Sequence, residues 1–409
     1  MRSVALISAG VISCVLVSGQ AWSAHTSTPP GLPFGWGNAV SSSNDKVEPG
    51  TPQWTVGAGL VDGLNKGDLK ALTNLVDMHA MAERLVPGFR GDPEVERYVE
   101  DGFLQDTLRG IVESYCRGVK GAHGTAKLLE IKMHAGQAHV RIRLDQGSLG
   151  FTYLEFVAEQ RPEGDFRVVN WFELNDNRLM DEQLGPVARL AADLDDQTSQ
   201  HKLFSSMRFS SSVANRLAQV GVLRSQGAYA KSLEAMNELP PMLAETLVML
   251  EMRAKDARRA NDMKEYYRVL GQINLKYGSD PSLGITLSDY YLQNNQLVKA
   301  IAGISSLENR IGVDGGTHIM RAHLLLEAKD YDGAVRSARK AVDLEPGLEG
   351  AWYCLAKSYV QSKNYPQAVV TYRSMQARFH QAFARQTFVS DPEFSAFVQS
   401  ADFGKWLPQ

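Results

Sequence analysis

The chain has 409 residues, of which 44% are apolar and 22% are charged. That composition is typical of a folded globular protein, and the length accommodates two or three domains. The 43 Lys and Arg residues nearly balance the 46 Asp and Glu residues, for a net charge of −3, which argues against a general affinity for nucleic acid or anionic membranes.

The first residues have the pattern of an export signal. Met1-Arg2 supplies a short positive start, residues 4–19 are mainly apolar, and Ala21-Trp22-Ser23 offers the small residues that a signal peptidase reads. We therefore predict a signal peptide over residues 1–23 and a periplasmic or secreted protein. Lipidation at Cys14, which would anchor the chain to a membrane, is the weaker alternative because the residues after Cys14 are still apolar.

A linker and then a folded domain follow the signal. Residues 24–53 contain five Pro, several Gly and a Ser run, which predicts a flexible linker. From residue 54 the pattern is helical, with a break at Gly67-Asp68, and it later changes to alternation. Four alternating stretches predict a meander of antiparallel strands, at about residues 129–133, 138–144, 151–156 and 166–174. Helices followed by strands indicate an α+β domain over residues 54–194.

This order of elements, with Gly67-Asp68 between the first two helices, resembles the nuclear-transport-factor-2-like fold, a cone that can enclose a small-molecule pocket. The resemblance raises one catalytic interpretation, in which His139 and Glu155 face the cone and act as general acid and base. Strand alternation gives a simpler expectation. It places the apolar residues of the second strand in the core and leaves His139, Arg141 and Arg143 in water. We expect this second arrangement.

A 34-residue period organises the chain after a polar connector at residues 195–212. In its clearest unit, Glu349–Ala382, apolar and aromatic residues recur at helical spacing on both sides of a polar break at Ser362-Lys363-Asn364. Ala356 and Ala368 are small where two antiparallel helices must approach closely. The unit resembles the tetratricopeptide repeat, a helix–turn–helix of about 34 residues. The resemblance implies a scaffold that binds other proteins.

Five such units are predicted over residues 213–382, because small residues and helix breakers recur at the same step. The units begin near Val213, Leu247, Pro281, Gly315 and Glu349. In the tail, residues 383–409, a capping helix is expected from Asp391-Pro392, with an apolar side of Phe394, Phe397, Val398, Phe403, Trp406 and Leu407. The predicted fold is an α-solenoid of about five hairpins with a C-terminal capping helix, joined to a smaller α+β domain with an antiparallel sheet.

The repeat resemblance also implies a binding groove, since the first helices of such units line the concave side of the solenoid. The candidate partner-binding residues that it selects are Arg224, Lys255, Arg258, Arg259, Asp289, Leu292, Ile319, His323, Leu326, Tyr353 and Lys357. Positive charges gather in the first two units, and apolar and aromatic groups in the later ones. We expect a protein partner that is acidic at one end and apolar at the other. The alternative is an ordinary solvated helix face.

The sequence contains no phosphate loop, His-Glu-x-x-His, Cys-x-x-Cys or Gly-x-Ser-x-Gly motif. No metal, cofactor or nucleic acid is therefore expected, and Cys116 and Cys354 are predicted to be separate buried thiols. The favoured function is an exported, non-catalytic protein-interaction adaptor. Two alternatives stay open: a cone domain that binds or converts a small molecule with the repeats as an accessory, and a self-assembling structural protein.

Overall fold

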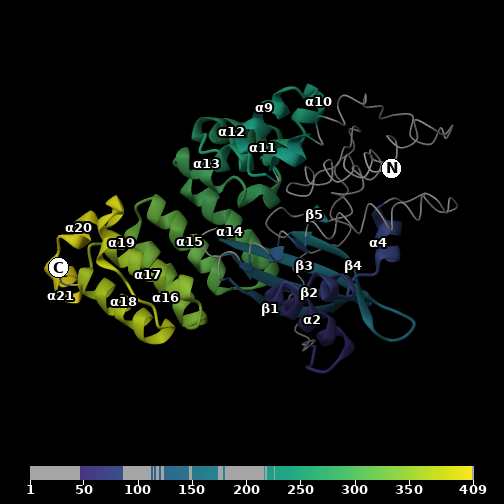
Figure 1. Ribbon diagram of the computed structural model, residues 1–409, viewed down its shortest axis with the longest axis horizontal. Coiled ribbons are helices and arrows are strands. Elements are labelled where there is room, and N and C mark those ends of the chain that lie inside the picture. The colour runs from purple at the N-terminus through teal and green to yellow at the C-terminus, as the bar shows by residue number, and fades with distance from the viewer. Residues whose placement is uncertain are drawn as a thin grey trace. The chain divides into compact units, whose positions relative to one another are not determined.

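The computed structural model describes residues 47–85, 112–113, 115–116, 119–120, 124–146, 150–173, 178–179, 216, 219–224 and 226–407. The chain forms two compact units, Met1–Tyr277 and Gly278–Gln409 (Figure 1). The predicted signal peptide, most of the predicted linker and the predicted connector lie outside the described residues. None of the described helices combines the length and the apolar run that a membrane crossing requires.

The described part of the first unit begins with three helices: α2 (Pro52–Lys66), α3 (Leu69–Thr73) and α4 (Met78–Leu85). Helix α2 ends at Gly67, whose φ is +64°, and Asp68 then caps α3 by accepting a hydrogen bond from the backbone N–H of Ala71 at 3.0 Å. Glycine adopts the left-handed conformation without steric cost, and aspartate satisfies an otherwise free helix N–H. The predicted break at Gly67-Asp68 is confirmed.

An antiparallel sheet with strand order β1-β2-β3-β4-β5 follows. Its strands are β1 (Ala126–His134), β2 (Gln137–Asp145), β3 (Phe151–Gln160), β4 (Phe166–Glu173) and β5 (Arg178–Leu179). Ala135 and Gly136, both with positive φ, connect β1 to β2 in the two-residue hairpin that suits the twist of the sheet. The four-stranded meander is confirmed, and the two-residue β5 was not predicted.

Helix α2 covers one face of this sheet. Val140, Ile142 and Leu144 are completely buried on that face, in the same apolar cluster as Val56, Leu60 and Leu64 of α2. The contact is close because α2 carries Gly57, where an added Cβ would lie 2.7 Å from Cδ1 of Ile131. The alternation of β2 therefore buries its apolar side as predicted.

Helix hairpins follow the sheet and extend to the tail. The first unit ends with α9 (Tyr229–Asn237), α10 (Pro241–Ala244), α11 (Leu247–Arg259) and α12 (Met263–Tyr277). The second unit contains η4 (Pro281–Gly284), α13 (Ser288–Gln293), α14 (Leu297–Ile311), α15 (Gly315–Glu327), α16 (Tyr331–Leu344), α17 (Glu349–Gln361) and α18 (Tyr365–Phe379). The second helices of the hairpins, α9, α12, α14, α16 and α18, each begin 34 residues after the previous one. The solenoid of hairpins is confirmed.

Every hairpin contains the same turn. Gly227, Asn261, Asn295, Lys329 and Lys363 recur at the 34-residue step and have φ between +57° and +74°. In each turn the left-handed residue donates its N–H to the carbonyl three residues earlier, and the next residue donates to the carbonyl five residues earlier. These two bonds define a Schellman motif, which ends one helix and lets the chain reverse. Asp262, Asp330 and Asn364 then cap the second helices through their side chains.

Small residues let the helices pack closely. Ala300, Ala322, Ala334, Ala356 and Ala368 are all completely buried. The third hairpin departs from the others because its first helix is split into η4 and α13. There Gly284 and Gly303 touch through their backbones, and a Cβ on Gly303 would lie 2.4 Å from the carbonyl carbon of Gly284. Cys116 and Cys354 are both buried and free, as predicted.

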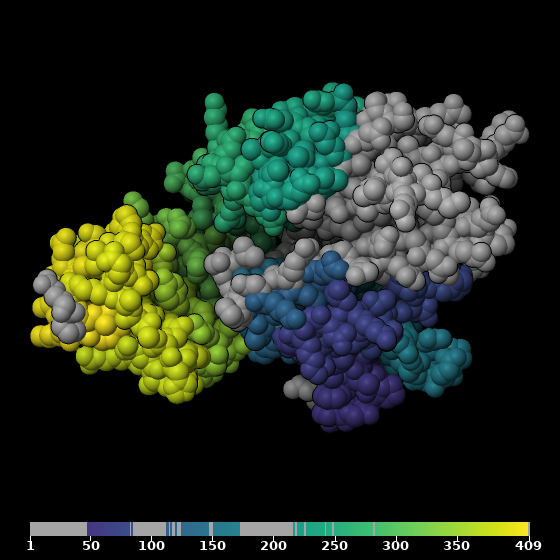
Figure 2. Space-filling view, in the orientation of Figure 1, coloured from purple at the N-terminus to yellow at the C-terminus, as the bar shows by residue number. Residues whose placement is uncertain are grey.

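The tail packs against the last hairpin through an aromatic cluster and not as one capping helix. Both parts lie at the yellow end of the space-filling view (Figure 2). It contains α19 (Arg385–Val389), η5 (Pro392–Phe394), α20 (Ser395–Val398) and α21 (Ala401–Trp406). The expected single helix from Asp391 is therefore wrong. Ser400 starts a new helix by accepting a hydrogen bond from the N–H of Phe403 at 3.2 Å. The predicted apolar residues Phe394, Phe397, Phe403 and Trp406 are nevertheless buried, and Trp406 stacks on Tyr372 of α18 with ring centroids 5.0 Å apart.

The left-handed turns predict an unusual effect of glycine. A lysine in the left-handed conformation costs about 1–2 kcal/mol of steric strain, which Lys363→Gly removes. Glycine also makes the unfolded chain more flexible, which cancels part of this gain, so the variant should be more stable than the wild type by roughly 0.5–1 kcal/mol. Lys340→Gly, which removes the same charge from an exposed position inside α16, should destabilise the protein by about 1 kcal/mol. Urea unfolding measures both. A lower free energy of unfolding for Lys363→Gly than for the wild type would contradict the left-handed turn.

Candidate functional site

The first helices of the hairpins carry the predicted partner-binding residues. We call the outer sides of the first helices the A face, taken separately in each unit: α11 in the first unit, and α13, α15 and α17 in the second. In the second unit α15 packs against both α13 and α17, so their A-face residues are neighbours. Arg258, Arg259, His323 and Tyr353 are exposed on this surface, and the half-buried residues are Lys255, Asp289, Leu292, Leu326 and Lys357.

Two of the predicted residues lie inside the protein. The Nε atom of Arg224 donates to Oδ1 of Asp256 at 2.8 Å, and the other carboxylate oxygen accepts a 2.7 Å hydrogen bond from Ser232. Arg224 is only 5% exposed and Asp256 is fully buried, so this arginine ties the first hairpin to α11 and is not part of a surface. Ile319 is also buried, and its side chain lies next to Gly350 of α17. The repeat register alone could not distinguish these core positions from surface ones.

Arg258 and Arg259 form an exposed basic pair at the C-terminal end of α11. The guanidinium of Arg258 lies 5.8 Å from the ring centre of Tyr266, and that of Arg259 lies 5.1 Å from the ring centre of Tyr229. Cation–π attraction restricts both side chains, and the negative end of the helix dipole favours their charge. The pair therefore presents positive charge to solvent with less conformational freedom than an unsupported arginine has.

A second polar patch lies on the A face of the last two hairpins. The charge of Lys357 acts on both His323 and Tyr353, and its Nζ atom lies 2.6 Å from Oε2 of Glu393 in the tail. Burial alone would lower the pKa of Lys357, but the hydrogen bond and charge of Glu393 outweigh burial and raise it. The pKa of His323 is lowered, first by partial burial among the surrounding helices and then by the positive charge of Lys357. Part of its side chain still reaches solvent. Sequence reasoning missed Glu393 because it lies in the tail, outside the repeat register.

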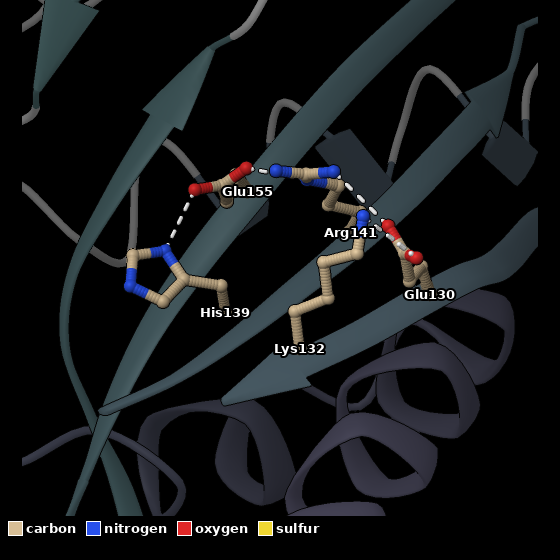
Figure 3. A network of polar contacts seen from close by, with 5 residues as sticks. All are labelled: Glu130, Lys132, His139, Arg141 and Glu155. Atoms are coloured by element: carbon tan, nitrogen blue, oxygen red, sulfur yellow. Dashed lines mark hydrogen bonds and ion pairs between the residues drawn. The ribbon is translucent and has the colours of Figure 1, made fainter. Parts of the chain in front are cut away.

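The sheet carries a network of charged and ionisable side chains on the face opposite α2 (Figure 3). Nδ1 of His139 lies 2.8 Å from Oε1 of Glu155, and Nε of Arg141 donates to Oε2 of Glu155 at 2.6 Å. Arg141 also donates to Glu130 at 3.0 Å, and Glu130 pairs with Lys132. A carboxylate only accepts hydrogen bonds, so the proton between His139 and Glu155 belongs to Nδ1.

The charged residues of β2 and β3 on this face are buried, which overturns the expectation that His139, Arg141 and Arg143 face water. His139, Arg141, Arg143 and Glu155 are between 2% and 4% exposed. Alternation correctly separates the two faces of β2, but it does not show whether the polar face is covered. Ion pairing explains how the charges tolerate burial, since Arg141 lies directly across from Glu155 on β3 and from Glu130 on β1.

Glu130 lies on the same face as this network because β1 alternates. Ile131 faces α2 near Gly57, so its neighbours Glu130 and Lys132 point to the opposite side of the sheet. The pairing of β1 with β2 is regular from the hairpin to Glu130, which pairs with Arg141, and its register shifts only beyond that, between Glu130 and Leu128. Alternation indicates the face of Glu130, but only the strand pairing places it opposite Arg141, and sequence reasoning therefore missed this contact.

The electrostatics of Glu155 favour charge compensation over acid–base chemistry. Burial by itself would raise its pKa, but the hydrogen bond from His139 and the charge and hydrogen bond of Arg141 lower it to about 2. A general base works best with a pKa near the working pH. The described contacts engage both oxygens of Glu155 with partners on β2, so the pair His139 and Glu155 acts as part of an ion network.

This network predicts a specific acid sensitivity. The pKa of Glu155 is about 2 in the folded protein, against 4.5 for the free side chain. The carboxylate therefore contributes stability above pH 4.5 that disappears as the pH falls toward 2, about 3 kcal/mol in all. Urea unfolding between pH 2.5 and 7, followed by tryptophan fluorescence, should show this loss.

Two variants separate Glu155 from the other carboxylates. Glu155→Gln leaves Arg141 without its buried counter-charge, so it should cost about 3–5 kcal/mol at pH 7 and flatten the pH dependence. Glu234→Gln, at an exposed position of α9, should behave like the wild type. Equal stability of Glu155→Gln and the wild type at pH 7 would show that the network does not stabilise the sheet.

Comparison with known proteins identifies the repeats. The family described as tetratricopeptide repeat matches residues 325–387, from α15 to α19. No curated protein matches. Several solved structures are similar to part of the chain. MamA AMB-1 is 13% identical with a TM-score of 0.32, over 40% of this chain and 97% of its own.

The second solved structure is a tetratricopeptide repeat protein from Parabacteroides merdae ATCC 43184. It is 11% identical with a TM-score of 0.37, over 50% of this chain and 76% of its own. The family match and the 34-residue step of the helices agree, and the C-terminal hairpins of this chain are tetratricopeptide-like repeats.

Proposed function

We propose that the chain is an exported, non-catalytic interaction protein that binds a segment of another protein on its A face. Tetratricopeptide repeats generally bind proteins and are generally not catalytic. The observation that carries the proposal is the regular hairpin turn, which repeats at five positions and keeps the first helices in the same place within each hairpin. These helices present exposed cationic and aromatic groups, including Arg258, Arg259 and Tyr353.

The distribution of charge supports a partner segment that is acidic toward one end. The exposed pair Arg258 and Arg259 is held by tyrosine rings in the first unit. In the second unit the A face offers Leu292, Leu326 and the exposed ring of Tyr353. Opposite charge speeds the encounter of two proteins, while apolar and aromatic contacts slow their separation. The A face of the first unit therefore favours an acidic segment of the partner, and the A face of the second unit favours an apolar one.

Export is part of the proposal and is supported by the positive start, the apolar run and the small residues before position 24. Cell fractionation combined with N-terminal sequencing of the mature protein tests it. A mature protein that starts after Ser23 in the exported fraction would support export, and a chain that keeps Met1 in the cytosol would contradict it.

The polar face of the sheet supports a second candidate function. Four charged or ionisable side chains of β2 and β3 are buried there, which is unusual for an ordinary sheet. A domain resembling the nuclear-transport-factor-2-like fold could use such a face to bind a small polar molecule. Thermal stabilisation of the full chain across a metabolite library tests this function, since a ligand of the folded state raises the melting temperature.

The basic pair gives the direct test of the A face. Partners are first captured from the exported fraction with the full chain as bait, and their association is then measured with the double variant Arg258→Glu and Arg259→Glu. Reversing two charges should lower the association rate at low salt by about tenfold or more and weaken its salt dependence. Circular dichroism should show an unchanged fold.

The matched control reverses two exposed arginines on second helices, Arg336→Glu and Arg373→Glu. It changes the net charge equally and should leave the association rate near that of the wild type. Equal rates for both double variants would mean that the partner does not use the A face. A captured partner that is the chain itself would favour self-assembly, which sizing at several concentrations would show.

A further inference from the structure

The tail touches the last hairpin at two separate places. Its aromatic residues pack on α18, where Phe388, Phe397 and Trp406 surround the ring of Tyr372 at centroid distances of 5.0–6.2 Å. All three are less than 10% exposed, so this cluster anchors the tail firmly. A short turn, η5, makes the second contact.

The turn reaches the first helix of the hairpin, α17. Lys357 pairs with the Glu393 carboxylate at 2.6 Å, and Nε2 of Gln361 donates to the backbone oxygen of Glu393 at 3.2 Å. Lys357 and Gln361 are four residues apart and therefore lie on the same side of α17, on the A face. Asp391 stabilises the turn by accepting a 2.9 Å hydrogen bond from the N–H of Glu393. The protein thus places a carboxylate and a peptide carbonyl of its own on the candidate binding surface.

The two contacts differ greatly in strength. The Glu393 side chain is 51% exposed and that of Lys357 is 27% exposed, and the bond from Gln361 is also exposed. An ion pair of this kind changes an equilibrium by about a factor of five at most. The aromatic anchor has no such solvent competition. The side chain and carbonyl of Glu393 can therefore leave α17 while the aromatic tail stays in place, including Phe394, whose ring centre lies 5.3 Å from that of Phe388.

We propose that Glu393, presented by the turn Asp391–Phe394, is a built-in competitor that covers the end of the A face until a carboxylate within the apolar part of a partner segment displaces it. The proposal rests on the proposed function, in that the A face is taken as the binding surface. An incoming carboxylate would replace Glu393 on Lys357, and an incoming peptide carbonyl would accept the hydrogen bond from Gln361. The aromatic anchor keeps the turn close enough to return when the segment leaves.

Chemical labelling of Lys357 tests the covering without any partner protein. The full chain is treated with a limiting amount of an amine-acetylating reagent, and modification is measured by peptide mass spectrometry. Labelling of Lys357 should be about two to five times faster in Glu393→Gln than in the wild type, and Lys340 serves as an internal reference. Asp343→Asn, an exposed change on α16, should have no effect. Equal labelling of Lys357 in all three proteins would overturn the proposal.

A synthetic peptide tests the competition. It copies residues 387–396 and therefore carries the Asp-Pro-Glu-Phe sequence of the turn. It should protect Lys357 from labelling at a several-fold lower concentration in Glu393→Gln than in the wild type, and the same peptide with Lys in place of Glu should not protect. Absence of protection, or equal protection of both proteins, would overturn the proposal. These measurements involve no natural partner, so they test the competitor separately from the proposed function. Unchanged labelling would overturn the competitor even if a captured partner depends on Arg258 and Arg259. Loss of that dependence would contradict the proposed function even if the labelling results are as expected.

Discussion

A left-handed residue between the two helices of each hairpin is the constraint on which the repeat region depends. It allows the two Schellman hydrogen bonds that end the first helix, and it reverses the chain so that the second helix can pack on the first. Glycine or asparagine tolerates this conformation in the first three hairpins, whereas Lys329 and Lys363 adopt it at a steric cost. The completely buried alanines on both helices then fix how closely they approach. Together these features keep the first helices equivalent and create the A face.

The sheet domain solves a different physical problem, which is the burial of charge. Burying an unpaired ion costs several kcal/mol, but Glu155 is held by His139 and Arg141, and Arg141 also contacts Glu130. The network also favours a single strand register, because a one-residue slip would turn these charges toward the apolar side covered by α2. It follows that the polar face contributes to the folding specificity of the domain whether or not it binds a ligand.

The sequence predicts those features that repeat and misses those that depend on a single tertiary contact. The period of small residues and helix breakers correctly predicts the helix hairpins, because identical local turns produce them. The burial of His139 and Arg141 was not predicted, since alternation distinguishes two faces of a strand without showing what covers each. Arg224 was assigned to the surface by its register, but Asp256 binds it inside the protein. The broken tail depends on the cap at Ser400, which an apolar pattern does not reveal.

Site-specific photo-crosslinking in the native cells tests most directly whether the A face is the binding surface. A photoreactive amino acid is placed at Arg258, His323 or Tyr353 on first helices, and at the exposed positions Ala302, Arg336 or Arg373 on second helices. Crosslinked partner should form from the first set and be absent or much weaker from the second. Crosslinks of equal strength from both sets, or only from the second, would contradict an interaction surface on the first helices.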